Sequence, residues 1–195
     1  MERHELAATR RGIADKYRQV AVSPAGLFRY PTGEESARTL GYPAALVAGI
    51  PPAVRDRFVG VGNPFALGPI GAGDAVLDLG CGAGFDALVA AQLVGPTGRV
   101  VGIDLSPEML AVASAALAET PYTWVSFRQG EVEALPFPDT SFDVVLSNGV
   151  LNLVPDKPRA VREIYRVLRP GGHLQACDIG LVGDEPPPDK APWSD

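Results

Sequence analysis

The feature that most constrains this chain is a glycine-rich turn directly after a buried strand. Ala75-Val76-Leu77-Asp78-Leu79 predicts the strand, and Gly80-Cys81-Gly82-Ala83-Gly84 predicts a tight turn into a helix over residues 85–94. Glycine lets the chain turn sharply and lets a ligand approach the backbone closely. In open α/β sheets, ligands bind beyond the carboxyl ends of the strands. The turn is therefore a candidate ligand site, and a turn that only connects strand to helix is the alternative.

Strands and helices alternate through the rest of the chain. Apolar runs predict further strands over residues 99–103, 124–128, 142–147 and 173–179, and helices are predicted over 2–20, 107–119 and 158–168. Helical spacing predicts that the buried face of the last helix consists of Val161, Ile164, Tyr165 and Leu168. The alternation predicts a mostly parallel sheet with right-handed crossovers, that is, a Rossmann-like three-layer α/β sandwich.

The chain divides into three parts by composition. Residues 1–70 are rich in Gly and Pro after the first helix, and Pro51-Pro52 is predicted to open one of several short helices there. Residues 71–180 hold the alternating strands and helices and form the predicted ligand-binding domain. Residues 181–195 form a Pro-rich tail that is predicted to be extended.

Charge and hydropathy exclude several classes of partner. The net charge is −6 and no basic face is evident, which disfavours nucleic acid. No stretch reaches the roughly 18 apolar residues of a membrane helix, and the N-terminus lacks the apolar run of a signal peptide. The two cysteines, Cys81 and Cys177, form no disulfide framework and fit a reducing, cytoplasmic location. The sequence leaves the oligomeric state open.

Two acidic positions strengthen the prediction of a ligand site. Asp104 ends the second predicted strand, 20 residues after Gly84, where an acid can accept hydrogen bonds from ribose hydroxyls. Glu131 follows the third predicted strand, where an acid could accept a hydrogen bond from an adenine amino group. An exposed turn acid is the alternative for Asp104.

A nicotinamide cofactor fits the glycine turn less well. Its fingerprint is Gly-x-Gly-x-x-Gly/Ala. Counted from Gly80, the third position is Phe85. Counted from Gly82, the third position is Ala87, which the pattern tolerates, but Asp78 and Gly80 then remain unexplained.

The pattern Asp-x-Gly-x-Gly-x-Gly over residues 78–84 is the first motif of class I methyltransferases, and this sequence resembles that family. The resemblance extends over residues 14–180. Four segments are similar to the arsenite methyltransferase group: Gly60-Val61-Gly62-Asn63-Pro64-Phe65, residues 80–86, Ser147-Asn148-Gly149-Val150-Leu151-Asn152-Leu153 and Pro155-Asp156-Lys157. Residues 133–139 and 167–172 are shared more widely, including with ubiquinone and menaquinone biosynthesis methyltransferases.

The resemblance implies S-adenosylmethionine as the cofactor. Asp78 and the turn that contains Gly80, Cys81, Gly82 and Gly84 would hold its methionine end. Asp104 would bind the ribose, Leu105 would pack on the adenine, and Glu131 with the backbone of Val132 would contact the adenine edge. Asn148 would lie near the sulfonium and the acceptor, and residues 1–70 would form a helical lid over the pocket.

The sequence departs from this family in two ways. Arsenite methyltransferases bind the metalloid through cysteines, and this chain has Val59 and Gly149 where two of those cysteines are expected. Cys81 lies in the cofactor turn, and Cys177 is predicted to be a buried strand thiol. A class I domain also has two more strands after the fifth, and the predicted fold lacks them. The bare sheet edge would then be open to pairing with another chain.

These observations predict an S-adenosylmethionine-dependent methyltransferase that acts on a small-molecule acceptor. We predict no metal site. Neither His4 nor His173 is a convincing general base, so the catalytic residues are unknown, and Tyr30, Asn148 and Asn152 are candidates to face the acceptor. Three alternatives stay open: a cofactor-binding module without catalysis, an arsenite methyltransferase with atypical ligands, and a nicotinamide-dependent oxidoreductase.

Overall fold

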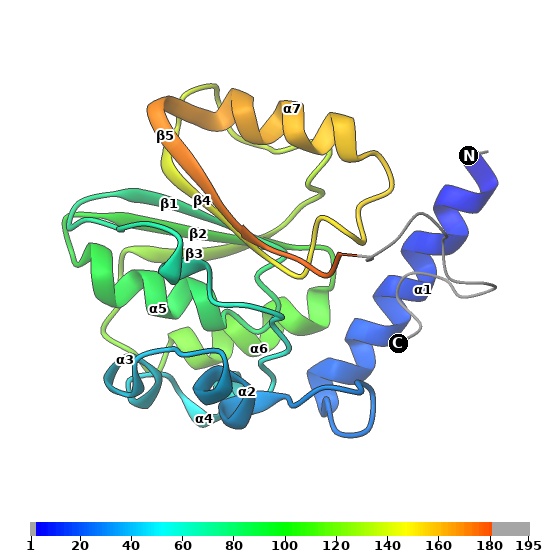
Figure 1. The fold of residues 1–195 in the computed structure, drawn as a ribbon, viewed down its shortest axis with the longest axis horizontal. Helices are drawn as coiled ribbons and strands as arrows, with labels where there is room; N and C mark the ends of the chain where they lie inside the picture. The colour runs from blue at the N-terminus through cyan, green and yellow to red at the C-terminus, as the bar shows by residue number, and fades with distance from the viewer. Residues whose placement is uncertain (1–2, 181–195) are drawn as a thin grey trace.

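The computed structural model describes residues 3–180 and has three layers, with a parallel sheet between two layers of helices (Figure 1). The sheet has five strands in the order β3-β2-β1-β4-β5, and each neighbouring pair is parallel. The strands are β1 (Ala75–Leu79), β2 (Arg99–Asp104), β3 (Val125–Gln129), β4 (Phe142–Asn148) and β5 (Leu168–Cys177). The predicted Rossmann-like α/β fold is confirmed.

Helices cover both faces of the sheet because successive strand side chains point to opposite sides. Helices α5 (Phe85–Val94) and α6 (Pro107–Leu117) lie on one face, and α7 (Lys157–Val167) lies on the other (Figure 1). Val76 and Val144 pack towards α5, whereas Leu77 and Val145 pack towards α7. Each of these four side chains is less than 2% exposed, so apolar burial on both faces of β1 and β4 stabilises the centre of the sheet.

The N-terminal third is helical and shares a core with α5 and α6. It contains α1 (Arg3–Val22), α2 (Gly33–Thr39), α3 (Ala44–Ala48), α4 (Pro52–Arg55) and the 3₁₀ turn η1 (Pro64–Ala66). Pro52 is the first residue of α4, as predicted, because a proline suits the first turn of a helix. Val20, Val54 and Phe58 are buried in one cluster with Phe85 and Met109, among others. This shared core fixes the position of the N-terminal helices over α5 and α6.

The predicted buried face of α7 is wrong in two positions. Val161 and Tyr165 are 55% and 83% exposed, whereas Ile164 is 3% exposed. The buried face consists of Ala160, Ile164 and Val167. The prediction failed because the face that packs on the sheet includes the small residue Ala160, at i, i+4 and i+7 spacing with Ile164 and Val167, and this places Val161 and Tyr165 on the solvent side. The helix also ends at Val167, so Leu168 is a strand residue.

Strand β5 starts earlier than the predicted 173–179. Leu168 already pairs with Phe142, and His173 pairs with Val144, so residues 169–172 bulge out opposite a single residue of β4. That residue is Asp143, which accepts hydrogen bonds from Arg169 at 2.6 and 2.8 Å. Within residues 3–180 the sheet ends at β5, and the predicted Pro-rich tail lies outside the described residues.

Candidate functional site

The carboxyl ends of the parallel strands lie along one edge of the sheet, where the winding of the chain reverses. From β1 the sheet grows through β2 to β3 on one side and through β4 to β5 on the other. The loops after β1 and β4 therefore diverge, and ligands of open α/β sheets bind in the crevice between such loops. An open cavity of about 1090 Å³, its mouth included, lies at this place and is lined by residues of both loops. It is called the main cavity below.

The glycine turn after β1 forms the floor of the main cavity. Gly80, Gly82 and Gly84 have positive φ angles of 59°, 53° and 91°, which residues with side chains rarely adopt. A Cβ at Gly80 would lie 2.5 Å from Val150 Cγ2, and one at Gly82 would lie 3.0 Å from Met109 Cε. The turn thus requires glycine because of its positive φ angles and because a side chain would clash. As a result, backbone atoms without side chains face the cavity.

Asp78 in β1 places a buried carboxyl group beside the glycine turn. It is 2% exposed and lines the main cavity. Its Oδ2 atom has no hydrogen-bond partner among the described residues. Burial, followed by repulsion from Asp86, raises the pKa of Asp78 well above its usual value. Such an acceptor needs a donor from outside the chain, and a ligand's ammonium group would provide one.

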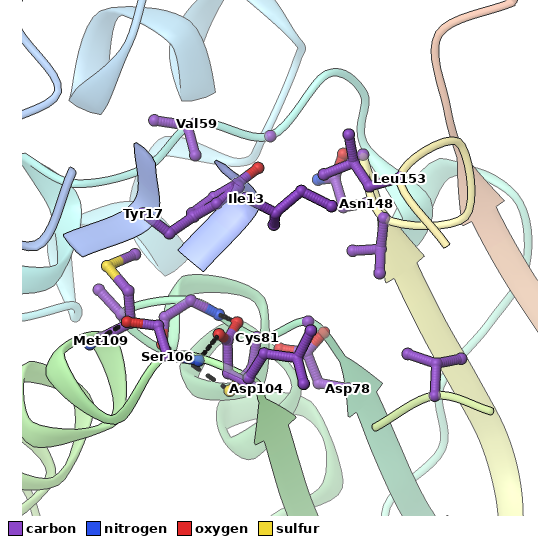
Figure 2. Close-up of a pocket in the computed structure, with 18 of the residues that line it drawn as sticks. Ile13, Tyr17, Val59, Asp78, Cys81, Asp104, Ser106, Met109, Asn148 and Leu153 are labelled. Atoms are coloured by element: carbon purple, nitrogen blue, oxygen red, sulfur yellow. Dashed lines mark hydrogen bonds between the residues drawn. The ribbon is translucent and has the colours of Figure 1, made fainter. Parts of the chain in front are cut away.

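Asp104 connects the glycine turn to the start of α6. Its Oδ2 accepts a hydrogen bond from Gly82 N at 2.8 Å, and its Oδ1 accepts one from Ser106 N at 2.8 Å (Figure 2). Ser106 caps α6 by accepting a hydrogen bond from Met109 N at 3.2 Å. Burial raises the pKa of Asp104, and the N–H groups bonded to its carboxylate oppose that rise. Each carboxylate oxygen retains a further lone pair, so Asp104 can also accept hydrogen bonds from a ligand.

The main cavity has an apolar side beyond Asp104. Leu105, Met109 and Val132 line it there, and Glu133 adds a carboxyl group that is 6% exposed. Glu131, predicted from the same loop after β3, is half-buried and is not among the described residues that line the cavity. The structure therefore brings Leu105 and Val132 to the cavity and offers Glu133 rather than Glu131 as the nearby acid.

Asn148 at the end of β4 is the centre of a hydrogen-bond network that we call the Asn148 network. Its Nδ2 atom donates to Asp86 Oδ2 at 2.9 Å and to Gly62 O at 2.9 Å. Its Oδ1 atom accepts from Val61 N at 2.9 Å and Gly62 N at 3.1 Å. The Tyr42 hydroxyl completes the network by donating to Asp86 Oδ1 at 2.7 Å. Four segments far apart in the sequence are thereby held together at one wall of the main cavity.

Asp86 in the first turn of α5 is the charged member of this network. It is 6% exposed, and burial raises its pKa to about 6. The hydrogen bonds from Tyr42 and Asn148 favour the ionised form and oppose that rise. Asp78 and Asp86 both line the main cavity, so a cationic group bound there would stabilise the ionised forms of their carboxyl groups.

Helix α1 lies over the mouth of the main cavity. Figure 2 shows Ile13 and Tyr17 of this helix facing Asp104 across the cavity. Arg18 joins α1 to the first turn of α6 through a 3.0 Å ion pair with Glu108. Because both side chains are substantially exposed, solvent screens the pair and it contributes little to stability. A lid function for this segment stays a prediction.

A smaller cavity of about 390 Å³ adjoins the main cavity, and we call it the side compartment. The sequence candidates Tyr30 and Asn152 line the side compartment, whereas Asn148 lines the main cavity. Residues that line both cavities form the junction between them, and these are Tyr17, Val59, Gly149 and Leu153.

Neither cysteine contributes a thiol to the junction. Cys81 is buried in the glycine turn, and its N–H group donates to Ile103 O at 2.9 Å. Cys177 ends β5, is half-buried rather than buried as predicted, and packs against Gly62. Burial raises the pKa of both thiols. Within residues 3–180, no three or more His, Cys, Asp or Glu side chains are grouped to hold a metal ion.

Most of the predicted cofactor residues meet at the main cavity: Asp78, Gly80, Cys81, Gly82, Asp104, Leu105, Val132 and Asn148. Gly84 packs instead against Phe127 beneath the glycine turn. Sequence reasoning did not single out Tyr17 or Asp86. Asp86 lies two residues after the glycine motif, and this position was a sequence signal for it, whereas only the tertiary fold brings Tyr17 to the cavity.

Comparison with known proteins identifies the family. The family model described as "Methyltransferase domain" matches residues 70–191, which is more than half of the chain. This chain belongs to the methyltransferase domain family. The methyltransferase is 45% identical over 148 residues to an arsenite methyltransferase from Halobacterium salinarum, covering 76% of this chain and 38% of that protein. It is 43% identical over 103 residues to a demethylmenaquinone methyltransferase from Symbiobacterium thermophilum, covering 52% of this chain and 41% of that protein.

A solved structure supports the same conclusion. An arsenic(III) S-adenosylmethionine methyltransferase from Chlamydomonas reinhardtii matches with a TM-score of 0.58 and 39% identity, covering 76% of this chain and 50% of that one. The predicted family and its cofactor, S-adenosylmethionine, are confirmed. The chain spans less than half the length of these two curated relatives. No helix within residues 3–180 combines the length and apolar character that crossing a membrane requires.

Proposed function

We propose that this methyltransferase transfers the methyl group of S-adenosylmethionine to a small organic acceptor and does not bind arsenite through cysteine thiolates. The observation that carries the proposal is the chemistry of the junction between the two cavities. Val59 and Gly149 line both cavities, and they occupy the positions where the resemblance to arsenite methyltransferases places metalloid-binding cysteines. A soft metalloid requires soft thiolate ligands, and neither residue supplies one.

The residues of the main cavity fit the cofactor. The unpartnered Oδ2 atom of Asp78 would accept a hydrogen bond from the ammonium group of the methionine moiety. Gly80 and Gly82 line the main cavity without side chains, so the backbone of the turn could approach that moiety closely. Asp104 would accept hydrogen bonds from the ribose hydroxyls, and Leu105 with Val132 would contact the adenine.

When bound, S-adenosylmethionine supplies an electrophilic methyl group: the acceptor's electron pair forms the new bond as the carbon–sulfur bond breaks, and S-adenosylhomocysteine leaves. The chain's own part is to align the acceptor and to exclude water. Tyr17 and Ile13 of α1 cover the cavity. The Asn148 network fixes the wall at residues 60–62.

The names of the relatives do not restrict the acceptor to one chemical class. Relatives at 45% and 43% identity are an arsenite methyltransferase and a demethylmenaquinone methyltransferase, so both inorganic and organic acceptors occur among proteins similar to this one. The apolar junction favours the organic class here. A soluble, cytoplasmic protein without nucleic-acid or membrane partners remains our prediction from the sequence.

The test is transfer of an isotope-labelled methyl group from S-adenosylmethionine to a panel of organic acceptors, with arsenite plus glutathione as a separate arm. We expect transfer to an organic acceptor and none to arsenite. The double variant Val59→Cys/Gly149→Cys should gain affinity for arsenite, and the matched Val59→Ser/Gly149→Ser variant should not. Arsenite methylation by the unmodified chain would contradict the proposal. Cofactor binding without transfer to any acceptor would instead identify a non-catalytic module.

A further inference from the structure

The side compartment is a hollow beside the main cavity to which no ligand has been assigned. Tyr17, Val59, Gly149 and Leu153 line both cavities, so the two adjoin at the junction. A molecule in the side compartment would lie next to the part of the main cavity that Asn148 lines. This geometry makes the side compartment a candidate place for a methyl acceptor.

Aromatic and aliphatic side chains form most of the side compartment. Phe28 and Tyr30 pack against each other with ring centroids 5.1 Å apart and an interplanar angle of 45°. The Lys16 ammonium lies 4.6 Å from the centroid of the Phe28 ring. Val61 and Leu153 add aliphatic surface. Aromatic rings bind most favourably to planar apolar groups, through offset or edge-to-face contacts.

Two features disfavour a cationic acceptor. None of the described residues that line the side compartment carries a carboxylate. The nearby Asp178 carboxylate already accepts hydrogen bonds from the N–H groups of Asn152 and Ile179 at 2.8 and 2.9 Å. An ammonium group would lose its hydration there without gaining a full counter-charge.

The two tyrosines of the side compartment differ in the use of their hydroxyl groups. The Tyr30 hydroxyl donates to Val59 O at 3.3 Å and so supports the wall of the junction. The Tyr17 hydroxyl has no hydrogen-bond partner in the part of the chain that the structure describes. Burial raises the pKa of Tyr30 to about 12 and also raises that of Tyr17, so both phenols stay protonated and able to donate.

We propose, building on the function proposed above, that the side compartment binds a planar aromatic acceptor that carries a phenolic hydroxyl, and that Tyr17 donates a hydrogen bond to that oxygen. The aromatic and aliphatic walls select the planar ring, and the junction presents it to the cofactor. Tyr17 is the polar group at the junction with hydrogen-bonding capacity to spare. Its position on α1 couples acceptor recognition to the helix that covers the cavity.

The test is calorimetric titration of the full chain, saturated with S-adenosylhomocysteine, with 1-naphthol and with decahydro-1-naphthol. The second probe keeps the hydroxyl and the carbon skeleton but is not planar. We expect 1-naphthol to bind at least about tenfold more tightly. Tyr17→Phe should weaken 1-naphthol binding by about fivefold to tenfold, as expected for one neutral hydrogen bond. Tyr165→Phe on the exposed face of α7 is the matched control and should have no effect.

A second variant protects the test against failure of Tyr17→Phe to fold. Ile179→Trp fills the side compartment, and Ile179 neither lines the main cavity nor belongs to the Asn148 network, so 1-naphthol binding should be lost while S-adenosylhomocysteine still binds. Equal affinity for the two probes, or 1-naphthol binding that survives Ile179→Trp, would overturn the inference and leave the proposed function standing. Failure to bind S-adenosylhomocysteine would overturn both.

Discussion

Replacing Tyr42 by Phe removes the hydroxyl group that completes the Asn148 network. Tyr42 is 5% exposed, and its ring makes edge contacts with Phe58, Phe65 and Phe85 at centroid distances of 5.3–5.9 Å. Phenylalanine preserves those contacts and removes only the hydroxyl. The change therefore deprives Asp86 of a donor at 2.7 Å and the Nδ2 atom of Asn148 of one acceptor at 3.1 Å, without opening an apolar cavity.

The magnitude depends on pH because Asp86 titrates. The pKa of Asp86 is raised to about 6, so the carboxylate is ionised at pH 7.5 and largely protonated at pH 5 in the folded state. A hydrogen bond to a charged group contributes about 1.5–3 kcal/mol, and one between neutral groups about 0.5–1.5 kcal/mol. Tyr42→Phe should thus lower the free energy of unfolding by about 2 kcal/mol at pH 7.5 and by about 1 kcal/mol at pH 5.

Urea unfolding at both pH values measures these losses, and thermal unfolding provides a check. For a chain of this size, 2 kcal/mol corresponds to a fall in Tm of about 4–8 °C. Tyr165→Phe is the control, since Tyr165 is 83% exposed and its loss of a hydroxyl should have no measurable effect. A loss for Tyr42→Phe that equals that of the control, or that does not shrink at pH 5, would refute the role assigned to the Tyr42–Asp86 hydrogen bond.

Four further predictions follow from the site and the core. Asp104→Ala should weaken binding of S-adenosylhomocysteine by about 1–3 kcal/mol in calorimetry, and unchanged affinity would remove Asp104 from the site. In urea unfolding, Gly80→Ala should lower the free energy of unfolding clearly more than Gly26→Ala. Both glycines have a positive φ, so both substitutions strain the backbone, but only a Cβ at Gly80 meets another side chain, at 2.5 Å from Val150. Burial raises the folded-state pKa of Asp86 to about 6 and also raises that of Asp78, so protonation of these groups contributes most to stability below the unfolded pKa near 4, and the Asp86 contribution is lost as pH rises through about 6. Because the ligand's ammonium group favours the ionised carboxylates, affinity for S-adenosylhomocysteine should rise over the range in which Asp86 ionises, and affinity that is independent of pH would contradict the assignment. Ile164→Ala should lower the free energy of unfolding by about 2–5 kcal/mol and Val161→Ala by less than about 0.5 kcal/mol, since Ile164 is 3% and Val161 55% exposed. Equal losses would mean that Val161 is buried, as the sequence pattern predicted.

The central elements of the fold could be predicted from the sequence because local chemistry determines them. The apolar run over residues 75–79 and the glycines at 80, 82 and 84 specify a buried strand and a turn with positive φ wherever they occur. Ser106 and Pro107 likewise mark the start of α6, where Ser106 caps the helix through Met109 N. Parallel pairing then places the ends of β1, β2 and β4 at one edge, so the positions of Asp78, Asp104 and Asn148 follow from topology.

The face of α7 and the start of β5 could not be predicted in the same way. Ala160 is small, and hydrophobic periodicity gives it little weight against Val161 and Tyr165, yet it is fully buried against the sheet. Leu168 continues the helical spacing in the sequence but adopts extended backbone angles, with φ −71° and ψ 137°. Packing of α7 against the sheet decides the first feature and pairing with β4 decides the second, and neither is local information.

The walls of the two cavities depend on contacts between distant segments. Tyr42 and Asp86 are 44 residues apart, and Asn148 lies 62 residues beyond Asp86, so no local pattern links them. Tyr17 reaches the main cavity only because α1 packs against α6. Sequence reasoning therefore found the residues that the strands and the glycine turn position, and missed those that the N-terminal helices bring in.

Calorimetric titration of the chain with S-adenosylmethionine and S-adenosylhomocysteine, beside NAD, tests most directly whether the cavity at the strand ends binds this cofactor. The account predicts micromolar binding of the first two compounds and no heat with NAD. Binding of NAD, or no heat with S-adenosylhomocysteine for a chain shown to be folded, would contradict it.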